Sequence, residues 1–217
     1  MEYMKTLSDN AFGIAIVDPP YGIRVGINGR VGDDKCAPCK QYKPVRWDEK
    51  PPNETYFKEL KRVSSNQIIW GINYHPFCLT GGRIVWDKDN SGDFSDCELA
   101  YQSFSMGVRK LAYRWNGMLQ QNMKNKEIRI HPTQKPVALY LWCLKNYAKP
   151  GDRILDTHGG SCSSAIACDI MGFDAVICEI DKDYYDAAVK RFNRHKQQQV
   201  LDFGGCADEK QKGSGCE

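Results

Sequence analysis

Short apolar runs that stop abruptly at polar residues set the pattern of this chain. Residues 12–17 form such a run and end at Asp18. Four more runs follow along the chain: 67–71, 83–87, 97–104 and 108–115. Runs of this length are typical of strands in a sheet that is buried on both faces. Met106-Gly107 separates the last two runs, which predicts that they form a hairpin.

Stretches with helical periodicity lie between and after these runs. Asn53 is a suitable N-cap for a helix whose apolar residues share one face: Tyr56, Phe57, Leu60 and Val63. A second helix with a broad apolar face begins near Pro136 and ends at Lys149-Pro150-Gly151. Both helices therefore have a face that a sheet can cover.

The C-terminal third alternates strand and helix. A strand over 152–156 is followed by a helix that reaches about Met171, where Gly172 stops it. A strand over 173–180 and a helix over 182–195 come next. This order predicts a parallel crossover. The whole chain therefore predicts a three-layer α/β fold, with a mostly parallel sheet, helices on both faces and one antiparallel hairpin strand.

Length and composition place these elements in one domain. The chain has 217 residues, and we assign 1–196 to the domain and 197–217 to a polar tail that is expected to be disordered. No apolar run is long enough to span a bilayer, and the N-terminus is polar, so we expect a soluble, cytoplasmic protein. The ten cysteines are then expected to be reduced thiols.

Two long polar segments carry an excess of cations. Residues 22–52 are rich in Gly, Pro and charge, and residues 116–130 include Lys124, Lys126 and Arg129. Long loops without periodicity are usually functional or disordered. Because the net charge of +3 permits a nucleic-acid partner, both loops are candidates for phosphate contacts. Solvated connections are the alternative.

The tetrapeptide Asp18-Pro19-Pro20-Tyr21 carries the first candidate chemistry. It follows a predicted buried strand, so Asp18 lies at the carboxyl end of the sheet, where open α/β folds bind ligands. The two prolines stiffen the turn and leave its carbonyls free to accept hydrogen bonds. An acid, a free carbonyl and an aromatic ring together suit a planar group with an exocyclic NH2. A plain strand-ending turn with a surface tyrosine is the alternative.

Two further segments supply polar groups for a second ligand. Thr133, Gln134 and Lys135 precede the helix that begins near Pro136, and a helix N-terminus favours a carboxylate. The small-residue turn 157–164 follows Asp156 and permits a close approach of backbone to ligand. Glu179 comes near the end of the next strand, at the spacing expected of an acid that binds a ribose diol.

A zinc site is a weaker alternative. Cys36 and Cys39 have ligand spacing, and His75 and Cys78 repeat it downstream. The second pair lies in an apolar stretch, and the separation between the pairs is loose, so we assign no metal site.

Taken together, these segments resemble the amino-group DNA methyltransferases that use S-adenosylmethionine. Asp18-Pro19-Pro20-Tyr21 matches the catalytic motif of that family, and residues 131–136 and 156–164 look like its cofactor-binding motifs. Glu179 falls where the ribose-binding acid of the family falls. The catalytic motif comes first, as in the β group, and the resemblance covers residues 8–195. It implies a Rossmann-like methyltransferase fold.

The resemblance implies a site-specific enzyme that methylates the N6 amine of adenine, flipped out of double-stranded DNA, by direct transfer. The implied catalytic residues are Asp18, Pro19, Pro20 and Tyr21. The residues implied for S-adenosylmethionine are Asp18, His131, Thr133, Gln134, Lys135, Asp156, Thr157, Gly159, Ser161, Cys162, Glu179 and Ile180. Asp18 and a proline carbonyl would accept hydrogen bonds from the amine while Tyr21 stacks on the base. No metal is needed, because the leaving group is a neutral thioether.

Two positions depart from the family pattern. Cys162 stands where a second glycine is usual, and His158 stands where an aromatic residue is usual. A Cβ at 162 is expected to crowd the methionine part of the cofactor. The alternatives to an adenine-N6 enzyme are a cytosine-N4 enzyme, an RNA or protein-amide methyltransferase, and an inactive DNA-binding relative. A homodimer is plausible for this group, and a restriction endonuclease partner is left open.

Overall fold

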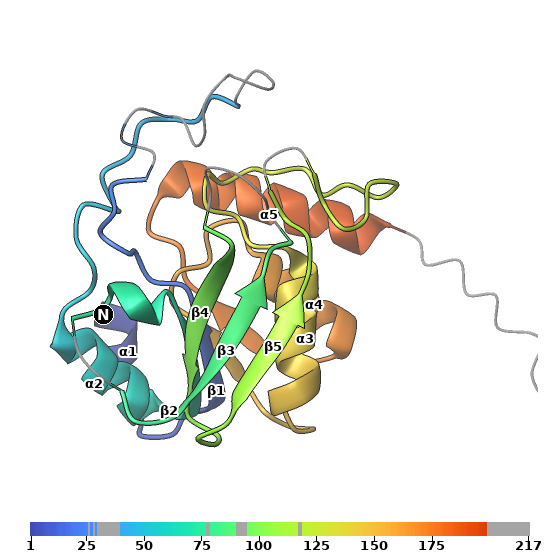
Figure 1. Ribbon diagram of the computed structural model, residues 1–217. Helices are drawn as coiled ribbons and strands as arrows, with labels where there is room; N and C mark the ends of the chain where they lie inside the picture. Colours follow the sequence, from blue (N-terminus) through green and yellow to red (C-terminus); the bar gives the residue numbers. More distant parts are fainter. Residues whose placement is uncertain are drawn as a thin grey trace, which may run out of the picture.

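The computed structural model describes residues 1–25, 27, 29, 40–76, 79–89, 95–116 and 119–198. A seven-stranded sheet runs through them (Figure 1). Its strands are β1 (Phe12–Val17), β2 (Ser64–Trp70), β3 (Gly82–Asp87), β4 (Cys97–Gln102), β5 (Val108–Ala112), β6 (Ile154–Asp156) and β7 (Ala175–Ile177). The helices are α1 (Glu2–Lys5), α2 (Glu54–Val63), α3 (Val137–Tyr147), α4 (Ser163–Met171) and α5 (Lys182–Gln197), with a 3₁₀ turn at Ile72–Tyr74.

The sheet is parallel except at one strand. Its order is β5-β3-β4-β2-β1-β6-β7, and β4 alone pairs antiparallel with both of its neighbours. The parallel pairs are in regular register, for example Ile16 opposite Ile68 between β1 and β2. The fold predicted from the sequence, a mostly parallel three-layer sheet with one antiparallel strand, is confirmed.

The predicted hairpin was placed on the wrong pair of strands. The antiparallel neighbours that follow one another in the chain are β3 and β4. The next strand, β5, crosses to the far side of β3 and pairs with it in parallel, so the runs 97–104 and 108–115 do not pair with each other. The apolar pattern marks each strand, but partner choice depends on which neighbouring edge is free, and the pattern does not record that.

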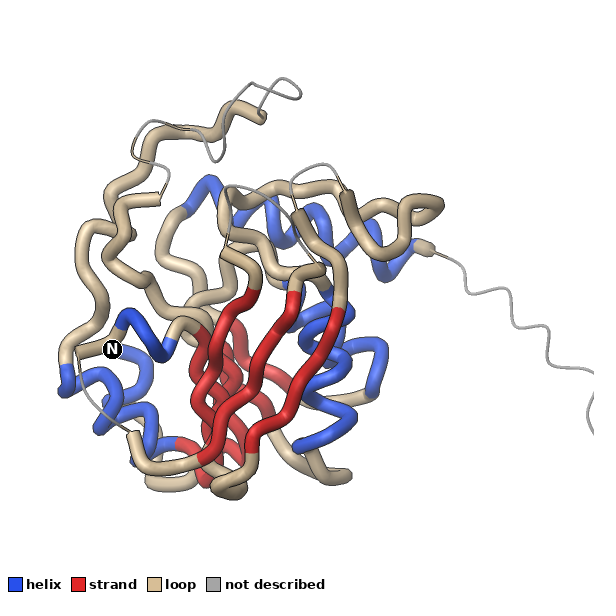
Figure 2. The backbone as a smooth tube through the Cα atoms, in the orientation of Figure 1, coloured by secondary structure: helices blue, strands red, loops and turns tan. Residues whose placement is uncertain are grey.

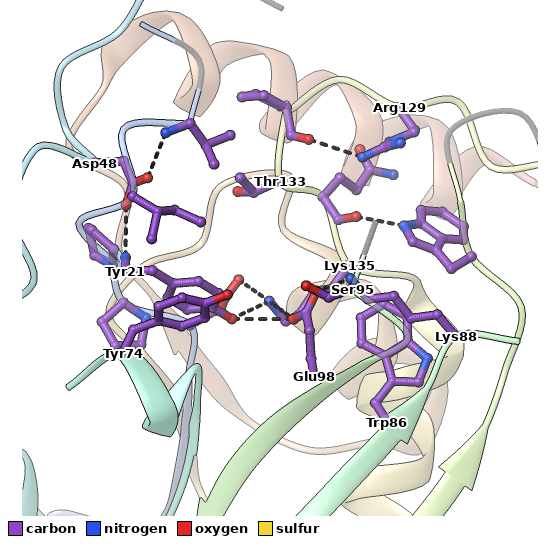
Figure 3. A pocket seen from close by; sticks show the side chains of 18 of the residues that line it. Tyr21, Asp48, Tyr74, Trp86, Lys88, Ser95, Glu98, Arg129, Thr133 and Lys135 are labelled. Carbon is purple, nitrogen blue, oxygen red and sulfur yellow. Dashed lines mark hydrogen bonds and ion pairs between the residues drawn. The ribbon is translucent and has the colours of Figure 1, made fainter. Parts of the chain in front are cut away.

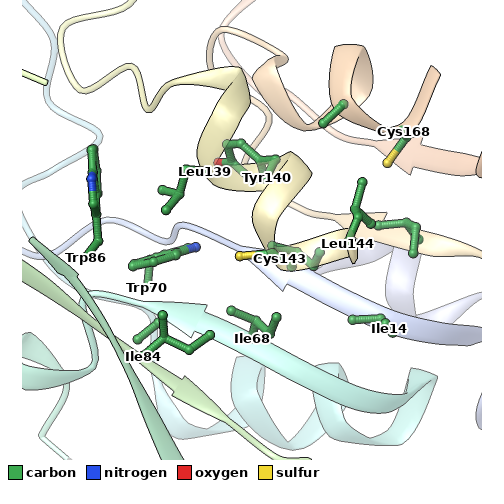
Figure 4. Close-up of a cluster of buried hydrophobic side chains, with 14 of the residues drawn as sticks. Ile14, Ile68, Trp70, Ile84, Trp86, Leu139, Tyr140, Cys143, Leu144 and Cys168 are labelled. Carbon is green, nitrogen blue, oxygen red and sulfur yellow. The ribbon is translucent and has the colours of Figure 1, made fainter. Parts of the chain in front are cut away.

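Helices cover both faces of the sheet (Figures 1 and 2). On one face, α1 and α2 enclose a core with residues from β1, β2 and β6, and the α2 residues in it are the predicted Tyr56, Phe57, Leu60 and Val63. On the other face, α3 and α4 pack over aliphatic and indole side chains (Figure 4). Trp70 and Trp86 meet edge to face there, with ring centroids 6.2 Å apart. No helix among the described residues has the length and apolarity needed to cross a membrane.

The helix ends follow local chemistry. The Asn53 side chain accepts a hydrogen bond from the Tyr56 amide, which caps α2 as predicted. Gly172 closes α4 in the left-handed conformation, at φ 72°. Strands β6 and β7 are shorter than the predicted 152–156 and 173–180, and α5 extends to Gln197. The rest of the predicted disordered tail, 199–217, lies outside the described residues.

Candidate active site

A pocket of about 250 Å³ opens at the carboxyl end of β1 (Figure 3). Figure 2 shows the long loops gathered at that end of the strands. The wall includes the complete predicted catalytic motif, Asp18 to Tyr21, together with Thr133, Gln134 and Lys135 from the segment before α3. Trp115 and Arg129, which lie in the loop between β5 and α3, also line it. Segments more than 100 residues apart in the chain therefore form one cavity.

The turn after β1 is held in shape by Asp48. One oxygen of its buried carboxylate accepts from the amides of Tyr21 and Gly22, at 2.8 and 2.9 Å, and the other accepts from the Val25 amide at 2.8 Å. Prolines 19 and 20 have no amide hydrogen to offer, so the first donors after Asp18 are those that Asp48 binds. The result is a rigid turn that does not depend on a ligand for its conformation.

The Tyr21 ring is fixed by close neighbours. Tyr74 stacks on it with centroids 4.8 Å apart and planes 12° apart. Gly71 lies against the ring in a left-handed conformation, at φ 68°, and a Cβ at that position would come within 2.0 Å of Tyr21 Cε1. The phenol donates to Asp18 Oδ1 at 2.8 Å. Tyr21 is therefore more constrained than a surface ring that merely packs on the proline pair.

Lys135 joins two buried carboxylates. Its Nζ lies 2.6 Å from Asp18 Oδ2 and 3.0 Å from Glu98 Oε2, and it donates to the Tyr21 hydroxyl at 3.0 Å. Lys88 binds the other oxygen of Glu98. The side chain of Lys135 is only 5% exposed, so its ammonium is committed to this cluster. The sequence predicts a cofactor contact for Lys135, and in the structure its charge lies toward Asp18 and Glu98.

The cluster decides which groups are ionised. Burial raises the pKa of Asp18, and the Lys135 ammonium opposes that rise. Burial would also raise the pKa of Glu98, yet Lys135 and Lys88 bring it down to about 2. Burial alone would lower the pKa of Lys135, but the two carboxylates raise it above its ordinary value. Glu98 and Lys135 are thus a firmly charged pair next to an acid that is closer to protonation.

The turn after β6 is organised by Asp156. This fully buried carboxylate accepts from the His158 amide at 3.0 Å and from the Ser164 hydroxyl at 2.6 Å. Burial raises the pKa of Asp156 to about 7, although the hydrogen bond from Ser164 opposes the rise. Thr157 Oγ1 lies 2.6 Å from the Tyr56 hydroxyl, which ties the turn to α2.

Glu179 lies beside this turn, just beyond β7. Its Oε2 accepts from the Gly160 amide at 2.7 Å, and its Oε1 accepts from the Asp181 amide at 2.8 Å. A carboxylate oxygen can accept two hydrogen bonds, so with respect to the described residues each oxygen keeps one acceptor position. Ile180 is 95% exposed and has no part in the core. Gly159 leaves no room for a side chain, because a Cβ there would lie 2.6 Å from Ile177 Cγ2.

His131 lies over the turn as a neutral ring. It stacks on Trp47 at 5.3 Å, meets Tyr184 edge to face at 4.3 Å, and its Nδ1 is 3.1 Å from Thr133 Oγ1. Burial lowers the pKa of His131 to about 4. His158 is also kept neutral by burial, which lowers its pKa to about 4, and it packs edge to face against Tyr56. A neutral imidazole thus takes the place of the usual aromatic side chain at position 158.

Gln134, predicted as a cofactor contact, is hydrogen-bonded to its own loop. Its side-chain oxygen accepts from the Ile130 amide at 2.8 Å, and its backbone carbonyl accepts from Trp115 Nε1 at 2.9 Å. The residue is 3% exposed. Its polar groups therefore hold the loop between β5 and α3 in place, and the residue also lines the pocket.

The two halves of the site are joined by hydrogen bonds. Ser163 Oγ donates to the Lys135 carbonyl at 2.7 Å and lies 3.1 Å from Ser161 Oγ. Arg191 of α5 donates to the Ser161 carbonyl at 2.7 Å and pairs with Glu127 at 2.7 Å. Lys135 thus connects the halves, since its ammonium binds Asp18 while its backbone binds the turn after β6.

Cys162 occupies a strained position. It precedes α4 in the left-handed conformation, at φ 55° and ψ 35°, which glycine adopts at lower cost. Burial raises the pKa of its thiol to about 12, so the group is a neutral thiol. Its Sγ would lie 3.4 Å from a Cβ added at Gly159. The departure from glycine that the sequence reveals therefore falls at a position where the backbone favours glycine.

Sequence reasoning missed several residues of the site. Glu98, Lys88, Asp48, Trp47 and Tyr74 all line the pocket, and none was singled out beforehand. Trp47 and Asp48 lie in the loop 22–52, whose lack of periodicity hides them. Glu98 begins an antiparallel strand, and its position next to Asp18 depends on the strand order. The only available signal was an acid early in an otherwise apolar run.

The zinc alternative has little to support it in the described part of the chain. No group of three histidine, cysteine or acidic side chains that could hold a metal occurs there, and Cys36, Cys39 and Cys78 lie outside it. His75 packs against Phe57 at 5.0 Å instead. The five described cysteines are free thiols: Cys97, Cys143, Cys162, Cys168 and Cys178.

Comparisons with known proteins agree with this architecture. A relative in Haemophilus parainfluenzae, the type II methyltransferase M.HpaI, is 33% identical over 69 residues. That stretch is 32% of this chain and 22% of M.HpaI, so the match spans about a fifth of the relative. The structure of the M1.HpyAVI–SAM complex is similar at a TM-score of 0.52, with 20% identity and coverage of 87% of this chain and 92% of that chain.

The cytosine-N4-specific PvuII DNA methyltransferase is similar at a TM-score of 0.54, with 13% identity and coverage of 87% and 82%. Identities this low establish a shared fold and nothing finer. A family model described as DNA methylase, of the N6/N4 type, matches residues 39–190. That match covers most of the chain and begins after the Asp18 turn, so it is independent of the catalytic motif. The chain therefore belongs to the N6/N4 DNA methylase family.

Proposed function

We propose that this protein transfers a methyl group from S-adenosylmethionine to an exocyclic amine of DNA, and that the acceptor is adenine N6. The observation that carries the proposal is the position of Asp18. Its carboxylate lies in the wall of a pocket, bound to Lys135, whose backbone in turn holds the small-residue turn after β6. A site for an amine and a site for a methyl donor are thereby joined through one residue.

The residues after β6 fit the cofactor. Gly159 and Gly160 leave the backbone uncovered beside Glu179, whose two oxygens each retain an acceptor position for a ribose hydroxyl. The neutral ring of His131 is 3.5 Å from the place of a Cβ on Gly160, and it offers an apolar surface. When bound, S-adenosylmethionine supplies an activated methyl group. Cys162 is the residue that fits least well, because glycine would adopt its backbone conformation at lower cost.

Asp18 and the carbonyls of the proline pair act on the acceptor amine. They accept its two N–H bonds, which favours a pyramidal nitrogen with its lone pair directed away from the ring. The gain comes from positioning, which is worth several kcal/mol in oriented reactions. The N–C bond would form as the methyl–sulfur bond of the donor breaks, which leaves a neutral thioether and a cationic nitrogen. That nitrogen would pass one proton along its hydrogen bond to the Asp18 carboxylate, which releases it to water.

The stacked pair of Tyr21 and Tyr74 provides a surface for the base. Tyr74 stacks on one face of Tyr21, so that face is closed to a base. Tyr74 is 37% exposed and offers part of the stacking surface in its place. An amine inside a duplex cannot reach such a pocket, and the base therefore has to flip out. Aromatic surfaces of this kind stabilise an unstacked base by about 1–3 kcal/mol.

The loop between β5 and α3 is suited to contact DNA. Its first half is closed on itself by Gln120, which accepts from the Glu127 amide at 2.8 Å and donates to the Glu127 carbonyl at 2.9 Å. The tip between them exposes Lys124 and Lys126 beside Met123, which is 52% exposed. In Figure 1 this loop projects at the end of the sheet where the pocket opens. Cations near a flipped base are expected to contact phosphates.

The test is methyl transfer from labelled S-adenosylmethionine to unmethylated plasmid DNA, followed by mass spectrometry of the nucleosides. We expect N6-methyladenine and a rate that falls steeply with salt, since phosphate contacts release counterions. N4-methylcytosine would overturn the choice of base but not the reaction. Absence of label in DNA, with label in RNA or protein or nowhere, would overturn the proposal. Calorimetry with the cofactor identifies an inactive relative, which would not bind it.

A further inference from the structure

Glu98 lies next to the predicted catalytic residue because β4 runs against its neighbours. The parallel strands end at the edge of the sheet where Asp18 is found, whereas β4 begins there. Glu98 is the second residue of β4, so its side chain lines the pocket from the start of that strand. No motif that the sequence analysis singled out includes it.

Glu98 contacts three members of the cluster around Asp18. Glu98 Oε2 is 3.0 Å from Lys135 Nζ and 3.3 Å from the Tyr21 hydroxyl, and Oε1 pairs with Lys88 (Figure 3). The side chains of Glu98, Lys88 and Asp18 are 18%, 16% and 14% exposed. Ion pairs this well shielded from water interact much more strongly than surface pairs do.

The charges of the cluster balance. It contains two carboxylates, Asp18 and Glu98, and two ammonium groups, Lys135 and Lys88. Removing one partner of such a set leaves a buried charge uncompensated, and the remaining groups rearrange to reduce that cost. Lys135 Nζ binds a single oxygen of Asp18, Oδ2, and is shared with Glu98. Without Glu98, the ammonium would be free to turn onto both oxygens of Asp18 and compete with an incoming amine for them.

We propose that Glu98, braced by Lys88, is a positioning residue that shares the Lys135 ammonium and confines it to one oxygen of Asp18, Oδ2, so that Asp18 stays an accessible hydrogen-bond acceptor for the substrate amine. This inference rests on the proposed function for its catalytic part. Its structural part, the control of Asp18 by Glu98, concerns the protein alone and can be measured without a substrate.

The groups that act on Asp18 come from each element around it. Tyr21 donates from the same turn, Lys135 approaches from the segment before α3, and Glu98 approaches from β4. Asp156 of β6 and Tyr140 of α3 interact with Asp18 at longer range. The negative charge of Glu98 raises the pKa of Asp18. Removing that charge therefore lowers the pKa of Asp18, both directly and by releasing Lys135 to it.

The experiment compares Glu98→Gln with Glu59→Gln. Glu59 is a matched control, because it pairs with Arg62 at 2.9 Å and has a similar side-chain exposure of 23%, but lies on α2. The first readout is the carboxyl pKa of Asp18. It is measured by an NMR titration of protein labelled at its Asp carboxyl carbons, and the Asp18 signal is assigned by its absence in Asp18→Asn. We expect that pKa to fall in Glu98→Gln and to stay unchanged in Glu59→Gln.

The second readout is the kinetics of methyl transfer. Glu98→Gln should lower kcat by about 100-fold, as misplacement of a reacting group does, and should move the acid limb of the pH–rate profile to lower pH. Cofactor affinity should be unchanged. Adding Lys88→Met to Glu98→Gln restores the balance of charge and should recover part of kcat. If Glu98→Gln does not fold, Glu98→Asp retains the charge and withdraws the carboxylate; it should lower kcat and leave the Asp18 pKa nearly unchanged.

An Asp18 pKa that is the same in Glu98→Gln and Glu59→Gln would overturn the inference, as would a kcat equal to that of Glu59→Gln. Wild-type protein that transfers no methyl group to DNA would defeat the proposed function instead. In that case the NMR titration still decides whether Glu98 controls Asp18, so the two failures are distinguishable.

Discussion

The half of the site around Asp18 and the half around Gly159 and Gly160 are built from different kinds of chemical group. Around Asp18, two carboxyl groups, two lysine side chains and a phenol meet in a pocket, and nearly every contact is between side chains. Around Gly159 and Gly160, backbone amides, small residues and neutral rings form the surface. The buried acid there, Asp156, accepts hydrogen bonds from the turn itself.

This difference has a consequence for substitutions. Under the proposed function, catalysis in the charged half depends on the identity and protonation of a few side chains, so single changes should reduce catalysis with little effect on cofactor binding. Cofactor binding in the neutral half then depends on backbone conformation and on rings that stay uncharged. Changes there should appear first as altered stability or cofactor affinity.

The largest expected effect is that of Asp18→Ala. Loss of the acceptor should lower kcat by at least about 1,000-fold, or about 4 kcal/mol of barrier, while cofactor affinity stays within about twofold. Labelled-methyl transfer and calorimetry measure the two quantities. Asp169→Ala is the control, since it removes a carboxylate that pairs with His195 and Lys196 on the far side of α4. Retained transfer would refute the role of Asp18.

Acid should destabilise the neutral half through His131. Its pKa is about 4 when folded and 6.5 ordinarily, so the unfolded chain binds the proton more readily. The contribution of His131 to the free energy of unfolding should be fully present above pH 6.5. It should fall by about 3 kcal/mol as the pH drops toward 4.

The measurement is urea unfolding of wild type and His131→Phe at pH about 7 and about 4. The wild type should lose about 3 kcal/mol more than the variant on acidification. Asp156 acts in the opposite direction, because its pKa is raised to about 7, and protonating it stabilises the folded state. It is present in both proteins and cancels from the difference. Equal losses in the two proteins would show that His131 is not kept neutral by the fold.

Gly71→Ala tests the packing of Tyr21. Gly71 and Gly172 have nearly the same φ, 68° and 72°, but only at Gly71 would a Cβ collide with a ring, 2.0 Å from Tyr21 Cε1. Both alanine variants should lose about 1 kcal/mol of stability through backbone strain. Only Gly71→Ala should also displace Tyr21 and lower kcat, by about 100-fold. Activity equal to that of Gly172→Ala would mean that the position of Tyr21 is not critical.

The smallest expected effect is that of Cys162→Gly. Relief of the left-handed conformation should stabilise the fold by up to about 1 kcal/mol, partly offset by the greater freedom of glycine in the unfolded chain. Cofactor affinity, measured by calorimetry, should rise by a few fold. Cys162→Ala keeps a Cβ at the same φ and should show neither gain. If Cys162→Gly and Cys162→Ala changed stability and cofactor affinity equally, the Cβ at position 162 would not be the cause of the strain or of the weaker cofactor binding.

The sequence by itself determined the strands, the main helices and the residues at three strand ends, because each depends on local periodicity, capping and turn chemistry. Asp18, Lys135, Asp156 and Glu179 were all found in this way. Only the tertiary structure decided that β3 rather than β5 pairs with β4, since strand partners are chosen by contacts between distant segments. The antiparallel pairing of β4 with β2, which lies beside β1, brings Glu98 near Asp18. The Lys135 ammonium then lies between the two acids, because buried charges lie where their partners are.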